Sequence, residues 1–242
     1  MAPGTVHRGS AEGVDPGDVR APPKVSGGSV RLLLCRREAT GLRGGPRVGS
    51  KPSGRNAMSE PRFTTLTPET MTTDQKRVAD AIQSGPRGAG LRGPFNALLR
   101  SPELCDLVQR LGAFVRFGTS IPQPLNEMAI IMAGRKWTAQ YEFYAHRRLA
   151  LEAGLSPASA DAIAANQHPA SMAKDEETVY DFVSEMLATG SVSDPTFQRV
   201  KDAFGERGVV DLVGAVGYYS LVSMTLNVAQ VPLPAGVTPP LK

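Results

Sequence analysis

The sequence predicts an all-α fold. Apolar residues recur at helical spacing in several segments between positions 73 and 228. Gly and Pro separate those segments at the places where helices commonly begin and end. No stretch shows the alternation of apolar and polar residues that is typical of a half-buried strand. We expect a compact helical bundle over residues 58–242, which is long enough for a single hydrophobic core.

Residues 1–57 differ from the rest of the chain in composition. They contain eleven Gly and six Pro, and ten Lys and Arg against four Asp and Glu. Such a segment buries too little apolar surface to offset its ordering entropy, so we expect disorder. A start codon assigned too far upstream is an alternative, because Met58 opens a more protein-like sequence. A targeting segment is a third interpretation, which the Gly, Pro and acidic residues make less favourable.

The first helices are predicted from their caps. Thr73 is a candidate N-cap ahead of DQKRVADAIQS, and Gly85-Pro86 ends that helix. The run from Gly85 to Pro94 is predicted to be a loop. The next helix covers Ser101 to Phe117, with Pro102 at its first position. Its apolar residues form one face: Leu104, Leu107, Val108, Leu111 and Val115.

A pair of helical stretches follows. The first begins near Pro122, and we expect a bend or an interruption between Gly134 and Ala139. The second covers Gln140 to Ala153 and ends at Gly154. A short helix from Ser156-Pro157 to about Asn166 comes next.

The C-terminal third is predicted to contain the most apolar helix. An amphipathic helix covers Lys174 to Thr189, and another opens at Ser193-Asp194-Pro195. Gly208 to Val228 is apolar nearly all round, which places it at the centre of a core or between subunits. The Pro-rich tail after Val228 is expected to be extended and to wrap a surface.

Composition excludes several classes of function. Residues 58–242 carry 17 basic and 19 acidic residues, so nothing in their charge favours a nucleic acid. The longest mostly apolar run, Leu212 to Leu226, is shorter than the ~20 residues of a membrane-spanning helix. Cys35 and Cys105 lie far apart without partners at metal-ligand spacing, so neither a disulfide framework nor a metal site is expected. With no apparent signal peptide, we expect a cytoplasmic protein that does not bind a membrane.

One stretch, Glu127 to Leu149, concentrates the groups that carry chemistry. On a helix, Glu142 and His146 are four residues apart and share a face with apolar residues. A carboxylate beside an imidazole can orient the ring and fix its tautomer, which suits proton transfer. Glu127 lies nineteen residues before His146 and could join the pair if the two stretches fold together. A hydrogen-bonded pair with a purely structural role is the alternative.

Other side chains of this stretch are candidates for binding a substrate. Trp137 and Tyr141 could shape a pocket, and Arg135 or Arg147 could hold a carboxylate. Packing is the alternative for the rings, and a solvated position is the alternative for the cations.

The segment NEMAIIMAGRKWTAQYEFYAHRRLALEAGLS resembles the carboxymuconolactone decarboxylase-like family, which includes the alkylhydroperoxidase D-type proteins. The resemblance covers most of residues 60–240. It rests on Glu127, on the W-x3-Y pattern at Trp137 and Tyr141, on Ala145-His146 and on the turn at Ala153–Ser156. It implies an all-helical fold that forms homo-oligomers, commonly trimers or hexamers.

The resemblance also separates two chemistries. With His146 as the family's histidine, Glu127 matches the family's glutamate, whereas the two peroxidase cysteines fall on Ala139 and Glu142. Thiol-based peroxide reduction needs a thiolate, so that mechanism is disfavoured. The decarboxylase branch lacks these cysteines, and it implies catalysis without a cofactor.

The sequence therefore yields three hypotheses. The first is a cofactor-independent lyase for a small carboxylated lactone or a related organic acid. In it His146 transfers the proton, and Glu127 and Glu142 orient the ring or relay the proton. The second is an antioxidant protein of the same fold that acts on peroxides. The third is a helical oligomer that binds a small ligand without catalysis.

Overall fold

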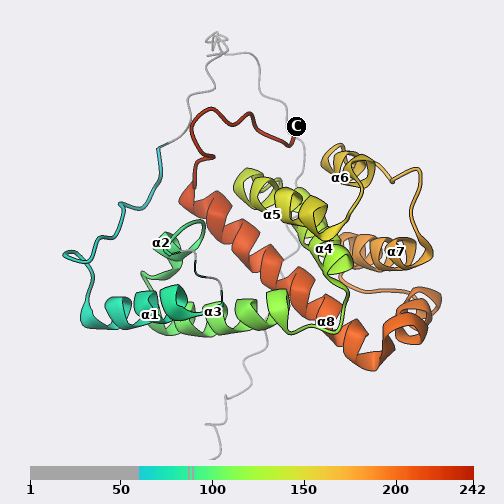
Figure 1. Cartoon of the computed structure of the whole chain (residues 1–242), viewed down its shortest axis with the longest axis horizontal. Coiled ribbons are helices and arrows are strands. Elements are labelled where there is room, and N and C mark those ends of the chain that lie inside the picture. The colour runs from blue at the N-terminus through green and yellow to red at the C-terminus, as the bar shows by residue number, and fades with distance from the viewer. Residues whose placement is uncertain (1–59, 87, 89) are drawn as a thin grey trace, which may run out of the picture. The chain divides into compact units, whose positions relative to one another are not determined.

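Helices α4 (Gln123–Lys136) and α5 (Gln140–Ala153) run antiparallel at the centre of the fold. Helices α5, α6, α7 and α8 all contact α4 (Figure 1). Ten consecutive residues of α4, Leu125 to Gly134, are buried. Burial on every side explains why this helix shows no single apolar face in the sequence.

The structure is a computed structural model, which describes residues 60–86, 88 and 90–242. Within them the prediction of an all-α fold is confirmed, because they form eight helices and no strand. They fall in one compact unit, Gly54–Lys242. The prediction of disorder for residues 1–57 lies outside the described residues.

A short turn reverses the chain between α4 and α5. It consists of Trp137, Thr138 and Ala139, so the interruption expected between Gly134 and Ala139 is confirmed. Thr138 adopts a positive φ of 48°, which is uncommon for a residue with a branched Cβ. At the other end of α5, Gly154 has a φ of 110° and ends the helix as predicted.

Three helices precede this pair: α1 (Thr73–Ser84), the short α2 (Phe95–Leu98) and α3 (Pro102–Phe117). The N-cap of α1 is Thr72 and not Thr73. The Gln75 amide donates to Thr72 Oγ1 over 3.3 Å, and the Thr72 amide donates to Gln75 Oε1 over 2.9 Å. This reciprocal pair of hydrogen bonds is a capping box. Because Gln75 lies three residues after Thr72, it favours Thr72 over Thr73 as the N-cap.

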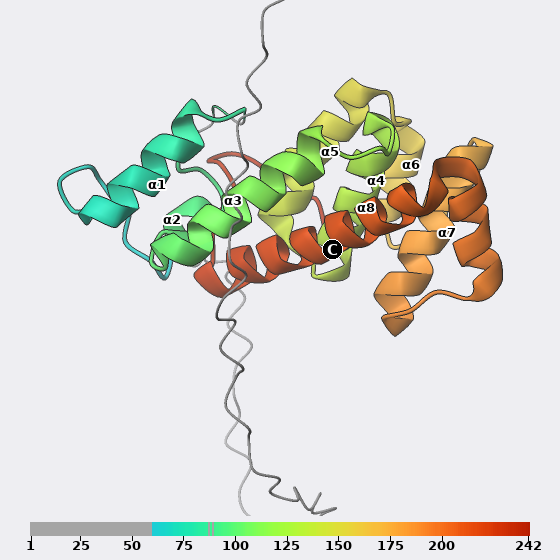
Figure 2. The same ribbon diagram turned by 90° about the horizontal axis from the view of Figure 1, so that it is seen from below.

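Three helices follow the pair: α6 (Pro157–Ala164), α7 (Lys174–Thr189) and α8 (Asp194–Ala229). Gly205 interrupts α8 with a φ of 71°, and Figure 1 shows the resulting bend near the start of the helix. Beyond it α8 runs beside α3, which Figure 2 shows from below.

Helix α8 is long and apolar enough to cross a membrane if length and composition alone are considered. However, 56% of its most apolar 18-residue window is buried inside the protein. This is the burial expected of a core helix, so the helix is weak evidence for a membrane span.

The apolar face of α3 is not uniformly buried. Val108 and Val115 lie in the core, whereas Leu104, Leu107 and Leu111 are 47%, 60% and 49% exposed. Helical spacing indicated that all five side chains share one face of the helix. The neighbouring helices cover only the part of that face that contains Val108 and Val115. The three leucines therefore lie on the outside of the described chain.

Polar contacts fix the connection between α3 and α4. The Ser120 amide and hydroxyl donate to Asp211 Oδ2 on α8 over 2.7 and 2.8 Å. Asn126 on α4 donates from Nδ2 to the Val115 carbonyl over 2.9 Å. At the other end of the chain, Gln140 and Leu241 exchange two hydrogen bonds, which hold the tail against α5 as the sequence predicted.

We predict that Gly208→Ala destabilises the protein. A Cβ at this buried position would collide with Phe204 Cβ and lie 3.3 Å from Ile121 Cδ1. Overpacking of this kind costs about 1–3 kcal/mol, and Gly208→Val should cost more. Chemical denaturation of the three proteins checks this order. An alanine variant as stable as the wild type would contradict it.

Candidate functional site

His146 lies between two carboxylates that reach it from opposite sides of its ring. Its Nδ1 is 2.7 Å from Glu127 Oε2 on α4, and its Nε2 is 3.1 Å from Glu142 Oε1, one turn earlier on α5. The antiparallel packing of α4 and α5 brings Glu127 to the ring across nineteen residues of sequence. The structure thus places together the three residues that the sequence proposed as a proton-transfer group.

All three members of this group are withdrawn from solvent. Glu127 is fully buried, and Glu142 and His146 are 3% and 7% exposed. A buried carboxylate needs compensating hydrogen bonds. Gln123 supplies one of them by donating from Nε2 to Glu127 Oε1 over 3.0 Å, which leaves Oε2 for the imidazole. Gln123 and Glu127 therefore fix the orientation of the ring.

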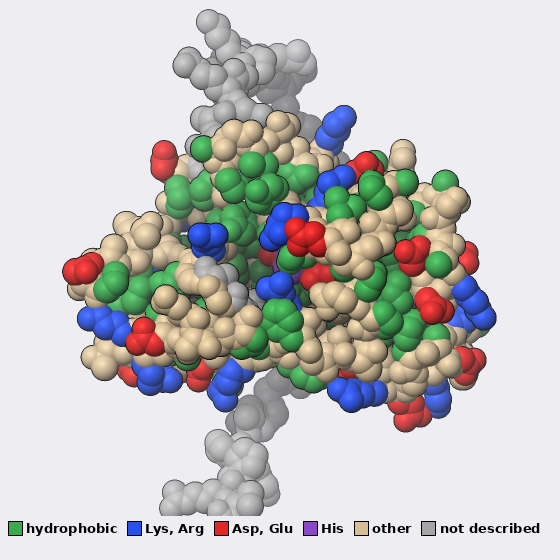
Figure 3. All heavy atoms as spheres, viewed as in Figure 1, with side chains coloured by type: hydrophobic (Ala, Val, Ile, Leu, Met, Phe, Trp, Pro, Cys, Tyr) green, Lys and Arg blue, Asp and Glu red, His purple; other side chains and the backbone are tan. Residues whose placement is uncertain are grey.

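A cavity of about 650 Å³ opens on the side of Glu142 and His146. Helices α3, α5 and α8 and the segment that leads into α2 form its walls. Figure 3 shows basic and acidic side chains gathered near the centre of this face, with histidine visible between them. Its polar and aromatic wall includes Arg92, Arg116, Tyr141, Arg148, Tyr218 and Tyr219.

Tyr219 packs its ring against His146, with 4.8 Å between the ring centroids and an edge-on angle of 73°. Burial, followed by the charge of Glu142, raises the pKa of Tyr219 well above its ordinary value. The same two causes raise the pKa of Tyr141. Both phenols therefore stay protonated at neutral pH, so they act as hydrogen-bond donors and not as bases. No hydrogen-bond partner of the buried Tyr219 hydroxyl occurs among the described residues.

Arg116 brings a positive charge from α3 to this cavity. Its guanidinium lies over the ring of Phe117, 4.9 Å from the centroid. Its Nε is buried and has no hydrogen-bond partner in the described part of the chain. By contrast Arg148, which also lines the cavity, pairs with Glu152 over 2.6 Å. Arg92, the third arginine of the wall, is exposed. The buried Nε without a partner therefore makes Arg116 the wall cation best placed to pair with an anionic ligand.

Of the predicted substrate-binding residues, only Tyr141 lines this cavity. Arg147 lies on another side of α5, where it pairs with Asp161 over 2.5 Å. Trp137 is 38% exposed in the turn after α4, and its carbonyl accepts a hydrogen bond from Asn227. Arg135 lines a different, smaller cavity.

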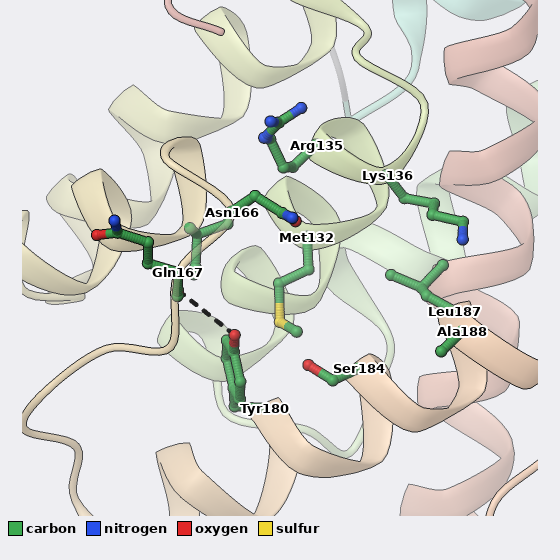
Figure 4. Close-up of a pocket in the computed structure, with 10 residues that line it drawn as sticks. Met132, Arg135, Lys136, Asn166, Gln167, Tyr180, Ser184, Leu187 and Ala188 are labelled. Carbon is green, nitrogen blue, oxygen red and sulfur yellow. Dashed lines mark hydrogen bonds between the residues drawn. The ribbon is translucent and has the colours of Figure 1, made fainter. Parts of the chain in front are cut away.

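That smaller cavity, of about 240 Å³, lies between α4, α6 and α7. Figure 4 shows Met132 pointing between Tyr180 and Ser184, while the Arg135 guanidinium points away from them. Arg135 is held instead by Thr138 and by the carbonyl of Lys242, at 3.3 and 3.4 Å. Arg135 and His146 therefore do not face a common ligand.

Sequence reasoning missed Arg116 and Tyr219. Arg116 belongs to α3 and Tyr219 to α8, so neither is a neighbour of the His146 stretch in sequence. The only available signal was their polarity inside otherwise apolar helical segments. That signal does not say which side chains meet in space.

The acidic groups and His146 do not form a metal site. Glu127 and Glu142 approach opposite ring nitrogens, so the three side chains do not point at one position. Within the described ranges, no group of three or more His, Cys, Asp or Glu side chains could hold a metal ion. The arrangement is suited to the storage and transfer of a proton at the wall of a cavity.

Comparison with models of known protein families, with curated proteins and with solved structures gave no match to this chain.

We predict that the Cys105 thiol is inert in the folded protein. It is fully buried, and burial raises its pKa to about 12. At about pH 8 iodoacetamide should leave Cys105 unmodified unless a denaturant is present, because the thiolate is the reactive form. Mass spectrometry of the peptide that contains Cys105, in a Cys35→Ser background, checks this. Rapid modification of the native protein would contradict it.

The raised pKa of Cys105 also makes the stability of the protein depend on pH. Above the ordinary pKa of 9.0 the unfolded thiol ionises while the folded thiol keeps its proton. The contribution of this thiol to stability is therefore present below about pH 9 and is lost as the pH rises towards 12.

Proposed function

We propose that this protein is a proton-transferring lyase that removes CO2 from a small carboxylated lactone or a related organic acid. The observation that carries the proposal is the position of His146, held between Glu127 and Glu142 at the wall of a cavity. The protein would belong to the carboxymuconolactone decarboxylase-like type, in a subgroup without the peroxidase cysteines. The all-helical fold and the resemblance of the segment around His146 support this assignment.

The proposed step needs one acid. When the carbon–carbon bond to the carboxylate breaks, CO2 leaves and the electron pair passes to an adjacent carbonyl as an enolate. A proton must then reach the carbon. His146, with Nδ1 held by Glu127, would deliver it directly or through Glu142, since both side chains line the cavity. Water would restore the proton afterwards, so the step itself requires no redox partner.

Arg116 supplies the charge that such a substrate needs. A carboxylate entering the cavity would meet two acids near His146, so a nearby cation is required to offset the repulsion. The buried Nε of Arg116 has no hydrogen-bond partner in the described chain, and Arg116 borders the same cavity. We therefore assign the substrate carboxylate to Arg116 in place of Arg135 and Arg147, which line other cavities.

The thiol-dependent alternative has little support from the site. Cys105 is buried with a raised pKa, and Ala139 and Glu142 stand at the two cysteine positions of the peroxidase pattern. The expected setting of the proposed enzyme is a homo-oligomer in the cytoplasm that acts on a free small molecule, with neither nucleic acid nor membrane as its partner.

We predict that His146→Ala abolishes most of the CO2 release found by screening carboxylated lactones and related acids. Loss of a general acid typically lowers kcat by about 10²- to 10⁴-fold. The matched control is His168→Ala, because His168 is exposed and contacts the Pro169 carbonyl and Asp181 instead. Thermal unfolding should verify that both variants are folded.

The two histidine variants separate the alternatives. Equal turnover by His146→Ala and the wild type would eliminate the proposed role of His146. If an acid binds stoichiometrically and no turnover is found for any acid, the protein is instead a non-catalytic ligand-binding protein.

We predict a different effect for Arg116→Gln. Because Arg116 is assigned to the carboxylate, its loss should weaken binding of the acid by roughly 10- to 100-fold, the usual value of a hydrogen bond to a charged group. The effect should appear mainly in KM, whereas that of His146→Ala should appear mainly in kcat. Arg110→Gln is the control, since Arg110 lies on the same helix and pairs with Asp106. Unchanged KM in Arg116→Gln would contradict the assignment.

A further inference from the structure

The outer sides of α3 and α8 carry most of the large apolar side chains that the described chain exposes. On α8 they follow a narrow stripe, because Val210, Val213, Met224 and Val228 are separated by 3, 11 and 4 residues, which correspond to about one, three and one helical turns. We call the combined surface the α3–α8 face. Its members are 43–68% exposed: Leu104, Leu107, Leu111, Phe114, Phe117, Val210, Val213, Met224 and Val228.

The two stripes lie side by side on neighbouring helices. Helices α3 and α8 contact each other, and Figure 2 shows them side by side. At one end, Leu104 of α3 lines the same apolar groove as Met224 and Val228 of α8. At the other end, Arg207 donates to the Gly118 carbonyl over 3.1 Å, so the start of the α8 stripe lies beside the end of α3.

The size of this face is that of a protein interface. Nine large side chains, each about half exposed, present on the order of 900 Å² of mostly apolar surface. The largest apolar patch of a typical monomer is roughly 300–600 Å². A stable interface of standard size buries about 800 Å² on each partner. The α3–α8 face is therefore large enough to hold two chains together.

We propose that the α3–α8 face binds the α3–α8 face of a second copy of this chain, in a dimer with two-fold symmetry. In such a dimer the same patch serves both subunits, so one apolar face is sufficient. A ring such as a trimer needs two different complementary patches. In the described part of the chain, the other large exposed apolar residues are scattered: Trp137, Tyr144 and Phe197. One extended apolar face thus favours a two-fold interface, in a dimer or within a hexamer, over the trimer that the family resemblance also implies.

The proposed dimer would also support the cavity around His146. Arg116 lies between Phe114 and Phe117 in sequence, and its guanidinium lies over the Phe117 ring. Burial of Phe117 in the interface would restrict this guanidinium at the cavity wall. The assembly itself does not depend on the proposed lyase activity.

The test is the molar mass of the full chain in solution. Sedimentation equilibrium over roughly 1–100 µM should give twice the 25.7 kDa chain mass, or another even multiple. The double variant Leu107→Glu/Val213→Glu puts two charges into the face and should lower the mass to that of half the assembly. Both residues are exposed, so circular dichroism should show unchanged helix content. Phe197→Glu, at an exposed apolar position outside the face, should keep the wild-type mass.

Several outcomes would overturn the proposal. A wild-type monomer throughout this range would do so, as would a trimer, or an assembly whose mass is unchanged in the double variant. A monomeric full chain that dimerises only after removal of residues 1–57 would mean that this segment covers the face. A monomer that sediments with anionic lipid vesicles, and no longer does so in the double variant, would mean that the face binds a membrane.

Discussion

The hydrogen bond between Glu127 and His146 is the interaction on which the rest of the site depends. A fully buried carboxylate on the most enclosed helix is costly unless its oxygens are paired. Gln123 satisfies one oxygen and His146 the other, so the side chains of two antiparallel helices are fixed relative to each other. The pair joins the centre of the fold to the wall of a cavity.

The helices around this pair place polar groups on more than one wall of the cavity. Helix α5 contributes Glu142 and His146, while α3 and α8 contribute Arg116 and the two adjacent tyrosines Tyr218 and Tyr219. The acids and the cation thus come from different elements, and a small anion between them would touch both. A proton donor on α5 and a carboxylate-binding cation on α3 can act on one ligand only if the two helices are held rigidly. The contacts of Ser120 with Asp211 and of Asn126 with the Val115 carbonyl provide that rigidity near the end of α3.

Helix α8 has two roles, which cannot be told apart in its sequence because the helix is apolar nearly all round. One side packs against α4 and α7 and supplies Tyr219 to the cavity, while the opposite side, with Val210 and Val213, is open to solvent in a single chain. A helix that is apolar on all sides is expected where other parts of the protein cover both of its sides. The proposed dimer would cover the second side without any change in the first.

Local patterns in the sequence were enough to predict the helices and much of the cluster around His146. The spans of α5 and α7 follow from Gly154 and Gly190, whose left-handed conformations end them. The i,i+4 relation of Glu142 and His146 is a local property of a helix. Spacing could not determine which side of α3 faces the core, because Leu107 and Val108 are equally apolar although only Val108 is buried.

The choice of distant residues that meet at the cavity depends on the packing of the whole fold. It placed Arg116 and Tyr219 at the cavity and Arg135 and Arg147 elsewhere. The physical reason is that the composition of the cavity depends on how α3 and α5 pack against α8. That packing is set by the whole core and by the chain reversal at Thr138, and not by any local pattern.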